Sequence, residues 1–362
     1  MGKILMKGNE AIGEAAIKAG CLNYFAYPIT PQSEVAEYLS RRMPEVGGVF
    51  LQGESEVAVG YMLFGAAGCG ARVFTTSSSP GISLMSEAIS YISSAQIPTV
   101  FVNIVRGGPG LGGILPSQAD YFQATKGGGH GDYRLLVMAP DGVQEAVEMV
   151  MMAFPLAEKY RNPVMILGDG LIGQMMEPVE FPEHLKSEPS NKDGWATSGM
   201  DTRNSKERNL VKSLFLDSEL LEAHNLALKA KYDLMKQEEI RYEPYHIDAD
   251  YQVLIVSYGI ISRVCRTAID ILKTEGFQAA MIRPQTLFPF PERAIEEAAS
   301  KDSCKVVVSI ELSMGQMVED VERSVRGKRP VHWYGKAGGD VPTPEEIIDA
   351  IKSFITLNLM NS

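Results

Sequence analysis

The feature that most constrains the fold is a regular alternation of short apolar runs with segments of helical length. The strand-like runs in the first part of the chain are residues 22–27, 72–76, 99–105 and 163–167. The segments between them, such as 31–43 and 143–159, have the length and pattern of helices. Strands that are apolar throughout and alternate with helices predict a parallel sheet covered by helices on both faces.

A change in composition divides the chain into two α/β parts. Residues 183–208 are polar and rich in Ser, Asn and Gly, which predicts a surface linker, and residues 211–241 have the pattern of a charged amphipathic helix. A second series of alternating runs begins at Tyr251. The fold class is therefore α/β with two doubly wound domains. The predicted boundaries are 1–182 for the first domain, 183–248 for the linker and charged helix, and 249–362 for the second domain.

Charge and cysteine content exclude several classes of protein. Asp and Glu total 45 against 34 Lys and Arg, and this net charge of −11 argues against nucleic acid or an anionic membrane as a main partner. No run approaches the roughly 20 apolar residues of a membrane span, and charged residues interrupt the N-terminal segment where a signal peptide would be apolar. We therefore expect a cytoplasmic protein. Cys21, Cys69, Cys265 and Cys304 are far apart, so neither an iron–sulfur cluster nor a zinc site is expected within the chain.

The turns that follow the strands are the candidate sites, because ligands of open α/β sheets bind at the carboxyl ends of the strands. The turn at 27–31, Tyr-Pro-Ile-Thr-Pro, holds the hydroxyl of Thr30 between two prolines. Two carboxylates, Glu54 and Glu56, begin a later helix of small residues. Each pattern has a structural alternative, since proline is common at the start of a helix and acids are favoured at helix N-termini.

Two further turns combine hydrogen-bond donors with a permissive backbone. Ser78 and Ser79 precede a helix, where hydroxyls suit an anion or a polar heterocycle but also cap helices. Arg106 follows an apolar strand and precedes the glycine-rich segment 107–113. Arginine is suited to bidentate binding of a carboxylate, and glycine permits close approach of the backbone to a ligand. The alternative is a flexible loop with a structural ion pair.

Two other motifs carry less weight. Residues 168–170, Gly-Asp-Gly, are similar to the start of a diphosphate- and magnesium-binding motif, but the paired asparagines of that motif are missing. A turn after a strand explains the segment equally well, and no metal ligand is assigned. His130, in the glycine-rich segment 127–132, is a candidate acid or base, with a structural loop as the preferred interpretation.

Taken together and in this order, segments 27–31, 54–58, 77–81 and 106–110 closely resemble the 2-oxoacid:ferredoxin oxidoreductases, in the subunit that carries their pyrimidine-binding domain. The resemblance covers nearly the whole chain. Residues 251–259, 283–291 and the Glu311-to-Gln316 segment look like the family's transketolase-C-terminal-like domain. The branched-chain, or 2-oxoisovalerate, type is the most similar, and the 2-oxoglutarate type is next. The segments that favour the branched-chain type are 107–113, 121–123, 127–132 and 334–339.

The resemblance implies that thiamine diphosphate lies between this chain and a partner subunit that holds the diphosphate and Mg2+. Glu56 matches the family's catalytic glutamate, which hydrogen-bonds the pyrimidine ring from a site shielded from water, and Glu54 is the reserve candidate. Thr30 and Arg106 match the family's substrate-contacting threonine and arginine. The expected cofactor contacts are Tyr27, Pro28, Ile29, Glu56, Ser78 and Ser79.

The resemblance also implies a divided enzyme. The expected partners are the subunit that binds the diphosphate end, a gamma-type subunit and a [4Fe–4S] cluster subunit or ferredoxin, in a hetero-oligomer with a dimeric repeat. The expected reaction converts 3-methyl-2-oxobutanoate and coenzyme A to an acyl-CoA and CO2. 2-Oxoglutarate stays open, since Lys126, Arg134 or a partner residue is available to bind its second carboxylate. Pyruvate and aromatic 2-oxoacids also stay open. A non-oxidative thiamine enzyme and an inactive assembly subunit are the remaining alternatives.

Overall fold

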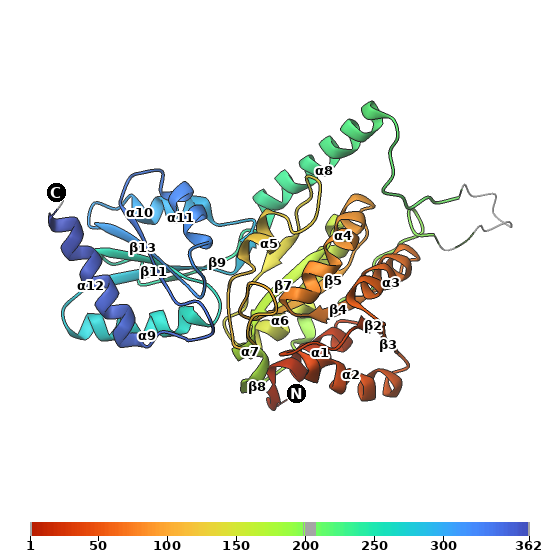
Figure 1. Cartoon of the computed structure of the whole chain (residues 1–362), viewed down its shortest axis with the longest axis horizontal. Coiled ribbons are helices and arrows are strands. Elements are labelled where there is room, and N and C mark those ends of the chain that lie inside the picture. The colour runs from red at the N-terminus through yellow and green to blue at the C-terminus, as the bar shows by residue number, and fades with distance from the viewer. Residues whose placement is uncertain (1, 198, 200–207, 361–362) are drawn as a thin grey trace.

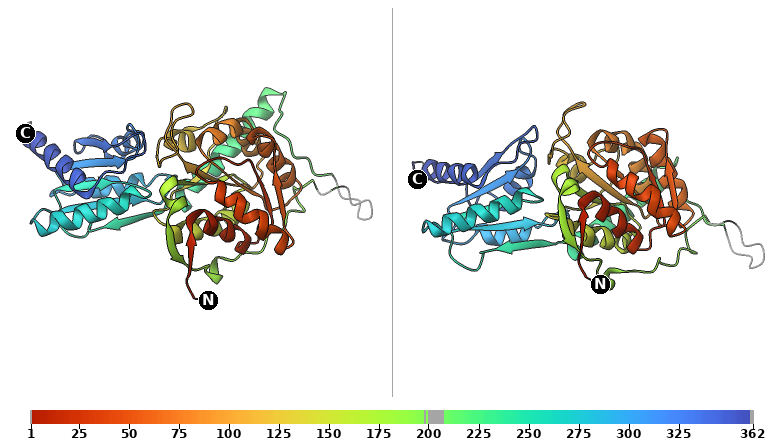
Figure 2. Two further views of the ribbon diagram at one scale, coloured as in Figure 1. Left: turned by 60° about the horizontal axis from the view of Figure 1, so that its bottom comes forward. Right: turned by 90° about the horizontal axis from the view of Figure 1, so that it is seen from below.

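The structure is a computed structural model that describes residues 2–197, 199 and 208–360. Two α/β lobes lie side by side, and helix α8 (Ser218–Glu238) runs along the N-terminal lobe (Figure 1). The same arrangement of lobes is visible from two further directions (Figure 2). Within the described ranges, no helix is both long and apolar enough to cross a membrane.

The first lobe contains a seven-stranded sheet with the order β12-β6-β7-β5-β4-β2-β3. Every neighbouring pair is parallel except β12 and β6, which are antiparallel. The predicted parallel sheet is therefore confirmed, with one antiparallel edge strand. Its strands are β2 (Asn23–Ala26), β3 (Val49–Gln52), β4 (Phe74–Ser77), β5 (Val100–Val105), β6 (Leu136–Met138), β7 (Val164–Asp169) and β12 (Thr286–Phe288).

Helices cover both faces of this sheet, as the sequence predicts. One face is covered by α1 (Gly8–Lys18), α2 (Ser33–Glu45) and α6 (Val143–Tyr160), and α7 (Gly170–Gln174) packs on α1. The other face is covered by α3 (Glu56–Gly68), α4 (Ser79–Ser94) and α5 (Tyr121–Lys126). A two-stranded ribbon of β1 (Ile4–Lys7) and β8 (Met176–Val179) and a 3-10 turn, η1 (Glu183–Leu185), complete the lobe.

The second lobe has a five-stranded sheet with the order β14-β13-β10-β11-β9. Strand β9 is antiparallel to its neighbour, and the other pairs are parallel. The strands are β9 (Tyr242–Tyr245), β10 (Val253–Val256), β11 (Ala279–Pro284), β13 (Val306–Glu311) and β14 (Val331–Gly335). The helices are α9 (Ile261–Thr274) and α12 (Pro344–Met360) on one face, with α10 (Glu292–Ala299) and α11 (Met317–Val325) on the other.

The two lobes are interlocked rather than joined only by a linker. Chain from the second lobe supplies β12, the edge strand of the first sheet. Just before β12, the buried guanidinium of Arg283 binds the carboxylate of Glu145 on α6 at 2.7 and 2.8 Å. Each of the two hydrophobic cores continues from one lobe into the other. The relative position of the lobes is thus set by shared strands, ion pairs and apolar packing.

The charged helix is shorter than the sequence predicts. It was expected from 211 to 241, but α8 begins at Ser218, where the side chain of Asp217 accepts a hydrogen bond from the N–H of Leu220 at 2.9 Å. This cap defines the start of the helix, and residues 208–217 have no regular secondary structure. The helix buries Leu228, Tyr232 and Met235 against the first lobe.

Part of the predicted linker also packs on the first lobe. The buried side chain of Arg72 donates hydrogen bonds to the backbone carbonyls of Ser187 and Glu188 at 2.7 and 3.1 Å. The ring of Trp195 lies under the guanidinium of Arg161. The predicted linker also includes residues 198 and 200–207, which lie outside the described residues.

Candidate active site

The order of the strands creates a switch point in the first sheet. The chain passes from β2 outward to β3, and then crosses to the other side of β2 to form β4. Such a reversal opens a crevice at the carboxyl ends of the two central strands, which is where open α/β sheets bind ligands. The turns after β2 and β4 both face this crevice, so residues 27–31 and 78–79 are brought together although they are far apart in the sequence.

The turn after β2 is exposed at its tip and fixed at its base. Tyr27, Pro28 and Thr30 are exposed, whereas Pro31 is buried. Two side-chain amides hold the carbonyl of Pro31: that of Asn9 donates at 2.9 Å and that of Gln174 at 3.2 Å. Helix α2 begins after this turn, at Ser33 rather than at Pro31 as the sequence suggested.

The side chain of Arg106 connects three segments of the site. Its Nη1 donates to the carbonyl of Thr30 at 2.9 Å, and its Nη2 donates to the carbonyl of Leu111 at 3.2 Å. Its backbone N–H donates to Oγ of Ser79 at 3.1 Å. Its Nε is buried and has no acceptor within the part of the chain that the structure describes. Arg106, Thr30 and Ser79 therefore form one cluster, in which the buried Nε–H of Arg106 lacks an acceptor among the described residues.

The two candidate glutamates have different surroundings. Glu54 is exposed, whereas Glu56 is only 6% exposed at the first turn of α3. The N-terminal cap of this helix is Ser55 and not one of the two glutamates, because Oγ of Ser55 accepts a hydrogen bond from the N–H of Ala58 at 3.2 Å. No described residue donates a hydrogen bond to the Glu56 carboxylate. Burial and a free acceptor favour Glu56 over Glu54 as the shielded carboxyl group.

Glycine is needed at position 81, beside this carboxylate. A Cβ atom there would lie 2.8 Å from Oε1 of Glu56 and would overlap the hydroxyl of Ser77. The carboxyl group therefore packs directly on the first turn of α4. The hydroxyls of Ser77 and Ser78 in the same place are buried and have no hydrogen-bond partner among residues 2–197, 199 and 208–360.

These unpaired groups test whether the crevice fits the aminopyrimidine of thiamine diphosphate. Buried polar groups are normally hydrogen-bonded, so the two unpaired hydroxyls of Ser77 and Ser78 indicate that a ligand with several polar atoms completes them, and the Glu56 carboxylate beside them is a further acceptor for it. A planar heterocycle with ring nitrogens and an amino group has the required donors and acceptors. The residues present fit this group.

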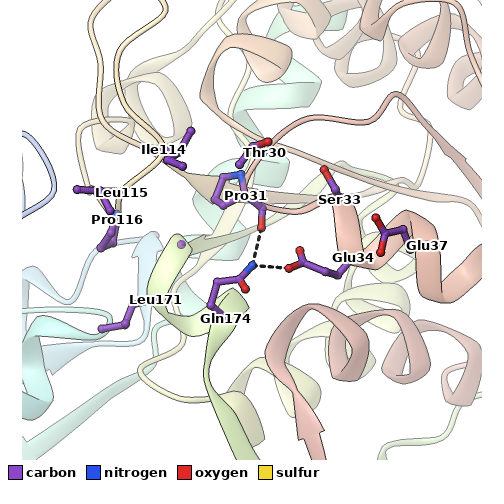
Figure 3. A pocket seen from close by; sticks show the side chains of 11 residues that line it. Thr30, Pro31, Ser33, Glu34, Glu37, Ile114, Leu115, Pro116, Leu171 and Gln174 are labelled. Atoms are coloured by element: carbon purple, nitrogen blue, oxygen red, sulfur yellow. Dashed lines mark hydrogen bonds between the residues drawn. The ribbon is translucent and has the colours of Figure 1, made fainter.

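A pocket of about 580 Å3 opens beside the turn (Figure 3). Thr30 and Pro31 form one side, and an apolar wall consists of Ile114, Leu115 and Leu171. On the polar side, Nε2 of Gln174 donates to Oε1 of Glu34 at 2.8 Å. Neither Lys nor Arg lines this pocket among the described residues.

The two cations left open by the sequence are engaged elsewhere. Nζ of Lys126 binds Asp320 in the second lobe at 2.6 Å. Arg134 donates to the backbone carbonyl of Tyr133 at 2.9 Å and lines other pockets. Neither side chain lies at the pocket beside Thr30.

The weaker motifs have structural roles. The carboxylate of Asp169 is buried and caps α7, accepting from the N–H groups of Leu171 and Ile172 at 2.9 and 3.1 Å. Burial raises its pKa to about 6 in spite of these hydrogen bonds. No cluster of His, Cys, Asp and Glu able to hold a metal occurs in the described ranges. The ring of His130 packs on Tyr91, at the opposite end of α4 from Glu56.

Two polar residues beside the site were missed from the sequence. Nδ2 of Asn103, on β5, donates to the carboxylate of Asp120 at 2.8 Å, and Oδ1 of Asn103 is buried without a partner among the described residues. Burial raises the pKa of Asp120, although hydrogen bonds from Ser79 and Asn103 oppose this. Asn103 sits inside an apolar strand, and a polar residue in such a run is the signal that would have identified it.

The Glu311-to-Gln316 segment positions the second lobe. The buried carboxylate of Glu311 accepts from the backbone N–H groups of Gln316, Met317 and Val318 at 2.9 to 3.0 Å, at the start of α11. The side chain of Gln316 in turn bonds the backbone of Ala119 and of Phe122 in the first lobe. This motif thus connects the second lobe to the segment that follows Arg106.

Comparisons with known proteins agree with this architecture. Residues 14–243 match the family described as "Pyruvate flavodoxin/ferredoxin oxidoreductase, thiamine diP-bdg", and residues 249–347 match "Pyruvate:ferredoxin oxidoreductase core domain II". The chain is 46% identical to the ketoisovalerate oxidoreductase subunit VorB of Methanothermobacter thermautotrophicus, over 96% of this chain and 97% of that protein. It is 34% identical to the 2-oxoglutarate synthase subunit KorA of the same organism, again over 96% and 97%.

Solved structures extend the likeness to the fold. A 2-oxoglutarate:ferredoxin oxidoreductase from Magnetococcus marinus, solved with 2-oxoglutarate, coenzyme A and succinyl-CoA bound, aligns with a TM-score of 0.84 and 27% identity. The alignment covers 97% of this chain but 65% of that one, so this chain spans about two thirds of its length. A split-gene transketolase aligns with a TM-score of 0.62 at 16% identity, which shows the fold alone. On this evidence, the chain belongs to the 2-oxoacid:ferredoxin oxidoreductase family, as a subunit with a thiamine-diphosphate pyrimidine-binding-type domain followed by a transketolase-C-terminal-like domain.

Proposed function

We propose that this chain is the pyrimidine-binding subunit of an enzyme that oxidatively decarboxylates 3-methyl-2-oxobutanoate. The acid loses CO2, its acyl group passes to coenzyme A, and the two electrons released reduce ferredoxin one at a time. One observation carries the proposal. The buried Glu56 carboxylate, which has no hydrogen-bond donor among the described residues, and the Arg106–Thr30 pair both lie at the switch point of the first sheet.

Glu56 would hold the aminopyrimidine end of thiamine diphosphate. Bound there, the cofactor supplies a nucleophilic carbon and accepts the electron pair left by CO2. The Glu56 carboxyl group would share a proton with a ring nitrogen, and its burial strengthens that hydrogen bond by excluding water. The hydroxyls of Ser78 and Ser79 and the exposed turn of Tyr27, Pro28 and Ile29 would contact the same cofactor.

Arg106 and Thr30 would orient the substrate. The guanidinium of Arg106 would bind the substrate carboxylate, and the Thr30 hydroxyl would donate to that group or to the ketone. The pocket beside Thr30 would receive the alkyl group, because Ile114, Leu115 and Leu171 form an apolar wall. A second carboxylate, as in 2-oxoglutarate, would find no cation in this chain's share of the pocket and would face Glu34. This contrast supports the branched-chain acid over 2-oxoglutarate.

The relatives are subunits of larger enzymes, and an exposed apolar rim around Glu56 supports a partner at this place. Val57 and Tyr61 on α3 and Leu84 on α4 are each at least 40% exposed. We propose that the subunit carrying Mg2+ and the diphosphate end covers this rim. Gamma-type and [4Fe–4S] cluster subunits would complete a cytoplasmic hetero-oligomer that delivers electrons to ferredoxin.

The proposal is tested by co-expressing the chain with its cluster-bearing and diphosphate-binding subunits and measuring reduction of a viologen dye with four 2-oxoacids. The panel is 3-methyl-2-oxobutanoate, 2-oxoglutarate, pyruvate and an aromatic 2-oxoacid. We expect reduction that requires coenzyme A and thiamine diphosphate, with the highest kcat/KM for the branched-chain acid. A preference for 2-oxoglutarate would contradict the substrate assignment. Decarboxylation without dye reduction would instead support a non-oxidative thiamine enzyme.

A further inference from the structure

The second lobe contacts the wall of the substrate pocket through a pair of glycines. Gly338 and Gly339 follow β14 and have positive φ angles of +100° and +108°. A Cβ atom at position 339 would overlap the Cβ atom of Leu115 and would lie 2.9 Å from its Cδ1. Leu115 lines the pocket beside Thr30, so the backbone of the second lobe packs directly on this wall.

The overlap involves a part of Leu115 that side-chain rotation cannot move. Rotation about the Cα–Cβ bond of a leucine changes the positions of Cγ and the methyl groups but leaves Cβ in place. A side chain at position 339 therefore fits only if the backbone of Leu115, or the backbone of the second-lobe loop, moves. Glycine at 339 is required both by the positive φ and by the close approach of Leu115.

The loop that carries Leu115 is held on both sides. The carbonyl of Leu115 accepts a hydrogen bond at 3.2 Å from the N–H of Gly107, the residue after Arg106. Three positions beyond Leu115, the buried side chain of Gln118 donates to the carbonyl of Tyr258 in the second lobe at 2.7 Å. A displacement of Leu115 is therefore confined to the segment between these anchors, and the open space beside that segment is the pocket that it lines.

The position of Leu115 determines how much room an alkyl group has. Leu115 belongs to the apolar wall with Ile114 and Leu171, and Glu34 lies across the pocket from it (Figure 3). One methylene more or less in an apolar pocket changes kcat/KM by about 10- to 200-fold. A shift of this wall by the size of a methyl group is thus sufficient to discriminate between acids of different size.

We propose that Gly339 is a positioning residue for substrate selectivity. Because it has no side chain, Leu115 can lie where the pocket accepts a branched alkyl group, and the second lobe thereby sets the size of that pocket. The role of Gly339 rests on the proposed function, since it takes the pocket beside Thr30 as the site of the alkyl group. It gives the second lobe a part in the choice of substrate.

The test compares Gly339→Ala with Gly338→Ala in the co-expressed complex. Both substitutions place a Cβ atom on a backbone with a similar positive φ, so their conformational costs are similar. A Cβ atom at Gly338 would have no described atom within 4 Å outside its chain neighbours, so this variant is the matched control. The quantity measured is the selectivity ratio, defined as kcat/KM for 3-methyl-2-oxobutanoate divided by kcat/KM for pyruvate in viologen reduction.

A second readout does not require turnover. Isothermal titration of the complex with 3-methylbutanoate and propanoate, which lack the ketone, gives the ratio of their affinities. A complex that reduces the dye with no 2-oxoacid would contradict the proposed function, while this affinity ratio would still test the role of Gly339. If neither acid binds the wild-type complex, the pocket is not a site for such acids and the role of Gly339 is overturned.

We expect Gly339→Ala to lower both ratios about tenfold, in turnover mainly through a higher KM for the branched acid, and Gly338→Ala to change them less than twofold. The variant Leu115→Gly lacks the atoms that the new Cβ would meet. In that background, Gly339→Ala should change the ratios less than twofold.

Equal ratios in the two alanine variants would overturn the proposal, as would the same effect of Gly339→Ala with and without the side chain of Leu115. If Gly339→Ala prevents assembly of the complex, its combination with Leu115→Gly decides the question. Assembly restored by the second substitution supports the contact, and assembly that is not restored overturns it.

Discussion

The guanidinium of Arg106 donates a hydrogen bond to the backbone carbonyl of Thr30 at 2.9 Å, although 76 positions separate the two residues in the sequence. A second bond, to the carbonyl of Leu111, connects the same guanidinium to the glycine-rich loop. Arg106 therefore positions both the turn after β2 and the loop that forms one wall of the pocket. The planar guanidinium allows this, because its N–H groups point in different directions and can donate to both carbonyls at once.

Replacing Arg106 by lysine should weaken substrate binding strongly. An ammonium group keeps the charge but cannot bind two carbonyls and a carboxylate in the geometry of a guanidinium. We expect Arg106→Lys to lower kcat/KM for the 2-oxoacid by roughly 100-fold, mainly through a higher KM. Steady-state kinetics of the assembled enzyme checks this, with Arg293→Lys at an exposed position as the control. An unchanged KM would contradict the role assigned to Arg106.

The buried carboxylate of Asp169 should make stability depend on pH. Burial raises its pKa to about 6 from an ordinary value of 3.8. Between about pH 4 and pH 6 the folded chain therefore holds a proton that the unfolded chain releases, and the free energy of unfolding falls as the pH rises through this window. Asp169→Asn keeps the oxygen that accepts from Leu171 and Ile172 but removes the titration.

The measurement is urea unfolding of both proteins between pH 4 and pH 8. As the pH rises from 4 to 8, the free energy of unfolding of the wild-type chain should fall by about 2 kcal/mol more than that of Asp169→Asn. This comparison holds even if the two proteins differ in stability at every pH. Parallel pH profiles for the two proteins would show that Asp169 does not titrate in this range.

The Arg72–Glu158 pair should be a major support of the first lobe. Burial alone would raise the pKa of Glu158, but hydrogen bonds from Arg72 and from the N–H of Ser190, with Lys192 nearby, hold it at about 2. The ionised carboxylate therefore contributes stability that is present above about pH 4.5 and is lost as the pH falls toward 2. Arg72 also holds the backbone of Ser187.

Arg72→Met would leave the buried Glu158 carboxylate with only the N–H of Ser190 and the nearby Lys192 to stabilise its charge. We expect it to lower the free energy of unfolding by about 3 kcal/mol at pH 7 and by less below pH 4.5. In Arg72→Met/Glu158→Met no charge remains unpaired, so part of the loss should be recovered. Urea unfolding at pH 7 and pH 3.5 measures both effects. A double variant less stable than the single one would argue that the ion pair is not the cause.

Local patterns predicted the elements that have strong local signals. The apolar strands β5 and β7 and the helices between them follow from periodicity, because a strand buried on both faces must be apolar throughout. The short strands β9 and β12 were missed. Strand β12 has three residues, and what makes it a strand is pairing with β6, a contact between lobes that no local window contains.

The same distinction holds for the site. The sequence alone left Glu54 and Glu56 as alternatives, and their different burial separates them only in three dimensions. The partner of Lys126 also required the fold, because Asp320 lies in the other lobe. By contrast, the order of the turns after the strands was sufficient to bring Thr30, Ser79 and Arg106 into one cluster.

The most direct test of the account is the turnover of the co-expressed complex carrying Glu56→Gln, measured as thiamine-diphosphate- and coenzyme-A-dependent reduction of viologen by 3-methyl-2-oxobutanoate. Glutamine keeps the size of the side chain but cannot share a proton with the cofactor's ring nitrogen. Glu54→Gln, on the exposed neighbour, is the matched control. We expect kcat to fall by about 100-fold or more in Glu56→Gln and to stay near wild type in Glu54→Gln, with the complex intact in both. Equal turnover of Glu56→Gln and the wild-type enzyme would contradict the account.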